Sequence, residues 1–74
     1  MFEDIKQILS ENYGIKDIDL NTDFKKDLGL NSFDLMNLVC LVEERYSIEL
    51  DEEKYRKMTT IGQMCDYLKT LIEE

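Results

Sequence analysis

The residue with the most promising setting for chemistry is Ser32, within the run DLGLNSFDL at residues 27–35. Asn31 and Ser32 are short polar residues of the kind that begin helices, and an apolar segment follows them. Free backbone N–H groups and the helix dipole at such a start stabilise an anion, so a phosphodiester on Ser32 would be favoured there. The chain has no histidine, which removes Ser-His and Cys-His nucleophilic catalysis. Ser32 therefore either caps the helix or accepts a group that another enzyme attaches.

The two cysteines, Cys40 and Cys65, both fall inside apolar helical patterns. A redox or metal-binding pair is one interpretation, but two reduced cysteines buried in the core suit these surroundings better. Two cysteines without histidine also do not make a structural zinc site. We therefore expect buried thiols and no metal.

An acidic loop raises the possibility of a calcium site. Asp17, Asp19, Asn21 and Asp23 occupy positions one, three, five and seven of an EF-hand pattern. However, a threonine stands where that pattern requires glycine, and a leucine where it requires a bidentate glutamate. A solvated loop that binds divalent ions weakly is the interpretation that this pattern leaves.

Helical segments must position these residues, because apolar side chains recur at helical spacing and nothing in the chain is typical of a strand. Gly14 suits the left-handed end of a first helix, Asp51 suits the cap of a short one, and Thr60 with Gln63 forms a capping box. The expected helices are residues 2–13, 32–46, 52–56 and 61–72. We predict an all-α fold, a single domain over residues 1–74 made of three main helices plus one short helix.

The segment between the first two helices, residues 15–31, has no sustained period but contains several apolar residues. A loop of this length is uncommon in a compact domain and tends to be functional, so we expect it to lie on the core. Asn21 or Thr22 is expected to cap one short helical turn around Phe24.

Size and charge narrow the function further. A chain of 74 residues has a thin core and little room to enclose a substrate, which argues against a self-sufficient enzyme. The net charge of -8 repels nucleic acids and anionic membranes and favours partners with basic surfaces. The sequence has no apolar run long enough to cross a membrane, and its first residues are acidic rather than basic. We therefore expect a cytoplasmic protein.

The motif and the order of helices resemble the acyl carrier protein family. In that family Asp-Leu-Gly is followed closely by Asp-Ser-Leu, and the serine carries 4'-phosphopantetheine; here the run is DLG, then Leu30, then NSF. The resemblance covers the whole chain, including Phe24 and the runs EERY (43–46), IELDEE (48–53), MTTIGQ (58–63) and YL (67–68). It implies a non-enzymatic carrier that holds acyl intermediates as thioesters on 4'-phosphopantetheine. It also implies that a phosphopantetheinyl transferase attaches this group, taken from coenzyme A, to Ser32.

Some residues depart from the family's pattern. Asn31 replaces an aspartate and Phe33 a leucine, while Asn37 and Arg45 stand where fatty-acid carriers generally have glutamates. The helix is therefore less acidic than in a typical fatty-acid carrier. Fatty-acid synthesis and a specialised pathway of polyketide or peptide type both remain open.

The helix that starts near Ser32 is the expected docking surface. Phe33, Met36 and Cys40 follow i, i+3, i+7 spacing, which suits either a core stripe or, by the resemblance, a partner-docking stripe. The docking residues expected from the resemblance are Phe33, Asp34, Met36, Asn37, Cys40, Glu43 and Glu44. The implied partners are the transferase and the acyl-loading and synthase enzymes with basic docking surfaces, and we expect the chain to be a monomer. An unmodified helical adaptor is the alternative, but it leaves the run from Gly29 to Ser32 unexplained.

Overall fold

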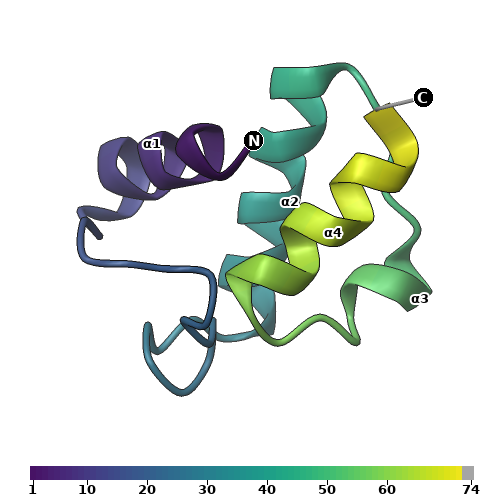
Figure 1. Ribbon diagram of the computed structural model, residues 1–74. Helices are drawn as coiled ribbons and strands as arrows, with labels where there is room; N and C mark the ends of the chain where they lie inside the picture. The colour runs from purple at the N-terminus through teal and green to yellow at the C-terminus, as the bar shows by residue number, and fades with distance from the viewer. Residues whose placement is uncertain (73–74) are drawn as a thin grey trace.

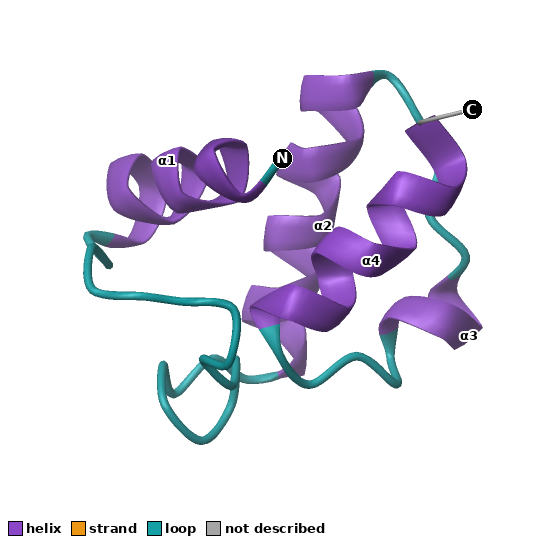
Figure 2. Ribbon diagram, in the orientation of Figure 1, coloured by secondary structure: helices purple, strands orange, loops and turns teal. Residues whose placement is uncertain are grey.

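A computed structural model describes residues 1–72, which form four helices (Figures 1 and 2). These are α1 (Phe2–Tyr13), α2 (Ser32–Tyr46), α3 (Glu52–Tyr55) and α4 (Ile61–Ile72). Strand-like pairing within these residues is limited to an isolated bridge between Asp23 and Thr60. The predicted all-α fold of three main helices plus one short helix is confirmed.

One hydrophobic core joins the three longer helices. Figure 1 shows α4 crossing in front of α2, with α1 on one side of this pair and the short α3 on the other. Each long helix buries residues at intervals of three or four, because that spacing places them on one face. The buried helical residues are Ile5, Ile8, Leu9, Leu35, Leu38, Val39, Val42, Ile61, Met64, Cys65 and Leu68. Each fully buried aliphatic side chain stabilises the fold by about 1.5–3 kcal/mol.

The helix ends follow the predicted signals. Gly14 ends α1 with φ of 69° in the left-handed region, which a residue without Cβ adopts most easily. The Asp51 carboxylate caps α3 by accepting a hydrogen bond from the Glu53 amide. At the start of α4, the Gln63 amide donates to Thr60 Oγ1 at 3.2 Å, and the Thr60 amide donates to Gln63 Oε1 at 3.4 Å. This reciprocal pair is the predicted capping box.

The long loop of residues 15–31 lies on the core, as expected, because Phe24 and Leu30 are both buried. Its short turn is capped differently from the prediction. The Asp23 carboxylate accepts hydrogen bonds from the amides of Lys25 and Lys26, each at 2.8 Å. The expectation that Asn21 or Thr22 would be the cap was wrong, because the backbone of Asn21 and the hydroxyl of Thr22 bond to Asp19 instead.

Backbone hydrogen bonds fasten this loop to the start of α4. The Phe24 amide donates to the Thr59 carbonyl at 2.8 Å, and the Gly62 amide donates to the Leu20 carbonyl, also at 2.8 Å. A Cβ at Gly62 would lie 2.8 Å from that same Leu20 oxygen, which is closer than such contacts allow. Glycine at this position therefore permits the close approach of loop and helix.

A polar cluster joins α1 to the end of α2. Asp4 accepts hydrogen bonds from Arg45 at 2.9 Å and from the Tyr46 hydroxyl, and Arg45 also donates to Gln7. The Tyr46 hydrogen bond, aided by Arg45, holds the pKa of Asp4 below its usual value. Burial and the Asp4 carboxylate together raise the pKa of Tyr46 to about 12. The Arg45 guanidinium is therefore bound by side chains of α1.

Within residues 1–72, no helix combines the length and the apolar character needed to cross a membrane.

Candidate functional site

Ser32 is the first residue of α2, but it is not the residue that caps the helix. Asn31 has extended backbone angles, and its side chain accepts a hydrogen bond from the Asp34 amide at 2.8 Å. The Asp34 carboxylate reaches back to the Asn31 amide at 3.3 Å, which completes a capping box. Because Asn31 fulfils the capping role, the exposed hydroxyl of Ser32 is not required for the helix. The interpretation of Ser32 as a simple cap is therefore excluded.

The turn before α2 sets the position of Ser32. The Gly29 amide donates to the Lys25 carbonyl at 3.1 Å, and Gly29 then takes φ of 71° in the left-handed region. This reversal directs Leu30 into the core, where its amide donates to the Phe24 carbonyl at 3.0 Å. With Phe24 and Leu30 both buried, the start of α2 is anchored on the core and Ser32 faces outward.

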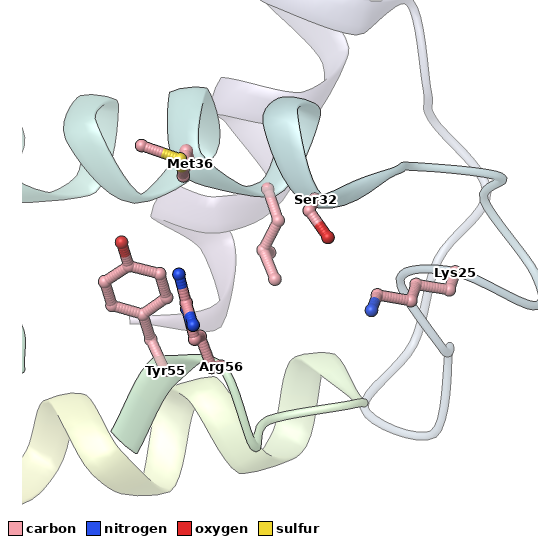
Figure 3. Close-up of a pocket in the computed structure, with 6 residues that line it drawn as sticks. Lys25, Ser32, Met36, Tyr55 and Arg56 are labelled. Atoms are coloured by element: carbon pink, nitrogen blue, oxygen red, sulfur yellow. The ribbon is translucent and has the colours of Figure 1, made fainter. Parts of the chain in front are cut away.

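A hollow of about 330 Å³ adjoins Ser32, between α2, the loop turn and the end of α3. Its lining residues are Lys25, Ser32, Leu35, Met36, Tyr55 and Arg56. Figure 3 shows the Ser32 hydroxyl and the Lys25 ammonium directed toward each other, with Tyr55 and Arg56 across the hollow from α2. One wall is therefore apolar and part of the rim is cationic.

The hollow contains no group that could activate the Ser32 hydroxyl. Its ionisable lining residues are two cations and a tyrosine. The carboxylate of Asp34, on the first turn of α2, is already bonded to the Asn31 amide. A serine without a neighbouring base is a weak nucleophile, so a second protein must supply the chemistry of any group transfer. The arrangement can receive and hold a group, with space beside the hydroxyl for the group's first atoms.

The outer face of α2 presents an exposed apolar stripe. Phe33 is 69% exposed and Met36 is 50% exposed, and the Cys40 thiol is exposed one helical turn further on. Asn37 and Glu44 are exposed as well. The stripe is therefore surface rather than core, because the inward positions of α2 are filled by Leu35, Leu38, Val39 and Val42.

The two cysteines have different surroundings, so the prediction that both are buried was wrong for Cys40. Cys65 on α4 is buried, and this burial raises the pKa of its thiol. Cys40 lies on the opposite side of α2 from Val39 and Val42 and is exposed. Apolar residues occur on almost every face of α2, so the sequence pattern did not show which face is exposed to solvent.

Two of the expected docking acids make hydrogen bonds within the fold. Asp34 is half-buried; its carboxylate serves the capping box, and its carbonyl accepts a hydrogen bond from the Tyr13 hydroxyl at 3.2 Å. Burial, with a smaller contribution from the Asp34 charge, raises the pKa of Tyr13. The Glu43 carboxylate accepts a hydrogen bond from the Leu50 amide at 2.8 Å. Of the three acids expected beside the stripe, Glu44 is exposed, whereas Asp34 and Glu43 are half-buried.

The carboxylates of the acidic loop accept hydrogen bonds from the loop's own backbone amides. Asp19 accepts from the Asn21 amide at 2.8 Å, and Asp23 accepts from two amides of the following turn. Among residues 1–72, no group of three or more acidic or cysteine side chains lies close enough together to hold a metal ion. The geometry therefore gives the calcium interpretation no support.

Sequence reasoning missed three residues of the hollow: Lys25, Tyr55 and Arg56. They come from a loop turn and from the end of a helix only four residues long. Neither segment has a periodic pattern that could place a side chain relative to Ser32. The only signal was the position of Lys25 in the turn just before the DLG run.

Comparison with known proteins gives a consistent result along most of the chain. The family described as "Phosphopantetheine attachment site" matches residues 3–68. An acyl carrier protein of Clostridium acetobutylicum is 33% identical over 76 aligned residues, which span 100% of this chain and 99% of that protein. An acyl carrier protein of Wolinella succinogenes is 32% identical, over 95% of each chain.

Solved structures show the same fold. An acyl carrier protein of Thermotoga maritima superimposes with a TM-score of 0.81 at 24% identity, over 92% of this chain and 81% of that one. A protein of Mycobacterium tuberculosis assigned as an acyl carrier protein superimposes with a TM-score of 0.87 at 20% identity, over 95% of this chain and 96% of that one. At these identities the likeness concerns the fold.

Proposed function

Because this chain belongs to the acyl carrier protein family, we propose that Ser32 is the residue that carries its 4'-phosphopantetheine. Acyl carrier proteins are non-enzymatic and carry acyl groups on phosphopantetheine, and the matching family is defined by the site of that attachment. When bound, the group supplies a thiol on which an acyl intermediate is held as a thioester. The chain's own residues fix the attachment point and present it to other enzymes.

The observation that carries this proposal is that Ser32 is exposed at the start of α2 while Asn31 takes over the capping role. The hydroxyl is thus free for modification without loss of the helix, and a hollow of about 330 Å³ beside it leaves space for the attached group. The helix N-terminus also favours the negative charge of a phosphodiester.

The other two serines are less suitable. Ser10 is half-buried within α1, and its carbonyl accepts the hydrogen bond that ends the helix. Ser47 is exposed but follows the end of α2 with φ of 57°, where the negative end of the helix dipole opposes an anion. Both facts favour Ser32.

We also propose that the transferase and the acyl-loading and synthase enzymes dock on the exposed stripe of Phe33, Met36 and Cys40. A contiguous exposed apolar patch is uncommon on soluble proteins and suits an interface. Asn37 and Glu44 border the stripe. The net charge of -8 would steer partners with basic surfaces toward the chain, and Glu44 acts at the rim.

Asp34 and Glu43 have a more limited part in this proposal. Their hydrogen bonds to Asn31 and Leu50 hold the start of α2 and the segment after it, although each still contributes its charge to the local field. Partners would therefore bind mainly through apolar contacts, with less dependence on acidic residues.

The pathway is fatty-acid synthesis or a specialised polyketide or peptide route. Loading assays with the partner enzymes of each pathway decide between them. The cytoplasmic location and the monomeric state stay predictions.

Intact-protein mass spectrometry tests the attachment. The apo chain incubated with coenzyme A and a phosphopantetheinyl transferase should gain the mass of one phosphopantetheine group. Ser32→Ala should gain nothing, whereas Ser47→Ala, a matched exposed serine, should be modified like the wild type. A Ser32→Ala protein that is still modified would overturn the assignment, and a wild-type chain that stays unmodified would favour an unmodified adaptor.

A further inference from the structure

The hollow beside Ser32 is cationic although the chain as a whole is strongly acidic. The net charge is -8, yet the charged residues that line the hollow are Lys25 and Arg56. Arg56 forms an ion pair with Glu52 at 2.6 Å on the exposed side of α3. Lys25 has no such carboxylate partner among residues 1–72. The ammonium of Lys25 therefore places a positive charge, without a direct ion pair, where the attached group would begin.

The backbone of Lys25 is fixed on both sides, which directs its side chain. Its amide donates to the Asp23 carboxylate at 2.8 Å, and its carbonyl accepts a hydrogen bond from Gly29 at 3.1 Å. The side chain then extends into the hollow, toward the Ser32 hydroxyl, as Figure 3 shows. Lys26 donates to the same Asp23 oxygen, but its side chain is not part of the lining. Lys25 therefore lines the hollow beside Ser32, whereas the adjacent Lys26 does not.

A negative charge on Ser32 would lie close to the carboxylate of Asp34. The Asp34 carboxylate already bonds to the amide of Asn31, the residue before Ser32. A phosphodiester attached to Ser32 would add a second negative charge at the start of α2, and like charges at short range repel. Lys25 is the unpaired cation of the hollow that can offset this repulsion and form a charge-assisted hydrogen bond with a phosphate oxygen.

We propose that Lys25 positions the prosthetic group by pairing with the phosphodiester that links it to Ser32. This inference rests on the proposed attachment to Ser32. The ion pair holds the first atoms of the group in the hollow, against Leu35 and Met36 on one side and Tyr55 on the other. The ligand recognised is a phosphate diester, and once the transferase has attached the group this pairing requires no further partner enzyme.

Phosphorus NMR of the modified protein tests the role of Lys25. Wild type, Lys25→Gln, Lys25→Arg and Lys26→Gln are each treated with coenzyme A and transferase, and intact mass first establishes that each carries the group. Absence of the group in the wild type would refute the attachment itself and so is distinct from failure of the Lys25 proposal. Circular dichroism establishes that each variant is folded, and Lys26→Gln is the control with the same change of charge.

In the folded wild type the phosphorus resonance should be shifted relative to that of the same modified chain unfolded in urea, which carries the same phosphodiester without the folded hollow. Lys25→Gln should lose more than half of this difference, while Lys25→Arg and Lys26→Gln should keep most of it. High salt should move the wild-type resonance toward that of Lys25→Gln, because screening weakens an exposed ion pair. If Lys25→Gln and Lys26→Gln both give the wild-type shift, Lys25 does not pair with the phosphodiester.

Discussion

Replacing Phe33 with alanine should weaken partner binding while leaving the fold almost unchanged. Phe33 is 69% exposed on the outer face of α2, so roughly a third of its side chain contributes buried area to the fold. Full burial of a phenylalanine stabilises by about 1.5–3 kcal/mol, so Phe33→Ala should lower the free energy of unfolding by less than about 1 kcal/mol. Urea unfolding followed by circular dichroism measures this difference.

The effect on binding should be larger than the effect on stability. An apolar anchor near the centre of an interface commonly costs more than about 1 kcal/mol on truncation, and each 1.4 kcal/mol is about tenfold in affinity. We therefore expect Phe33→Ala to raise the Kd for the transferase by about fivefold or more. Titration of the transferase with apo protein, at equal concentrations of folded chain, gives this value.

Leu38→Ala is the matched control, on the same helix but on its buried side. Leu38 is 0% exposed, and truncation of such a residue costs about 2–5 kcal/mol of folding free energy. Its folded fraction should still bind the transferase normally. The reasoning is refuted if Phe33→Ala is as destabilising as Leu38→Ala, or if Phe33→Ala binds the transferase with wild-type affinity.

Four further measurements test other parts of the account. Asn31→Ala removes the side-chain cap of α2 and should lower the free energy of unfolding by about 0.5–2 kcal/mol in urea titrations, unlike Asn37→Ala on the exposed face. Tyr46→Phe should cost about 1–2 kcal/mol near neutral pH. The folded pKa of Asp4 is lowered, so this advantage of the wild type should shrink as the pH falls below the ordinary pKa of an aspartate. The folded pKa of Tyr46 is raised to about 12, so the advantage should also shrink as the pH rises from about 10 toward 12. A cost of Tyr46→Phe that is independent of pH would contradict the Asp4 cluster. With a net charge of -8, the melting temperature should rise with added salt, and a fall would contradict the expected self-repulsion. Glu44→Lys should chiefly slow association with the transferase, with a loss that shrinks at high salt, and an effect confined to dissociation would contradict its position at the rim.

The helices and their ends could be predicted from the sequence because their signals are local. Gly14, Asp51 and the Thr60–Gln63 pair each act on backbone groups within a few residues, so their type and spacing are sufficient. The position of Ser32 at the start of α2 follows from the same local logic. The choice between Asn31 and Ser32 as the cap did not, because both residue types suit that role and only the backbone angles distinguish them.

The orientation of α2 and the lining of the hollow depend on tertiary packing. The sequence of α2 is apolar almost all round, so the exposure of Cys40 became apparent only once Val39 and Val42 faced the core. The hollow brings together a loop residue, Lys25, and the end of a four-residue helix, Arg56. No periodic pattern relates these segments to Ser32, so their meeting could not be predicted.

Peptide mapping of the acyl-loaded protein tests the central claim most directly. The apo chain is loaded from an acyl-coenzyme A by a transferase, digested, and analysed by tandem mass spectrometry before and after treatment with hydroxylamine. The account predicts one acyl-phosphopantetheine group, located on Ser32, from which hydroxylamine releases the acyl part as expected for a thioester. An acyl group on Ser10, Ser47 or Cys40, or no loading of the folded chain, would contradict the account.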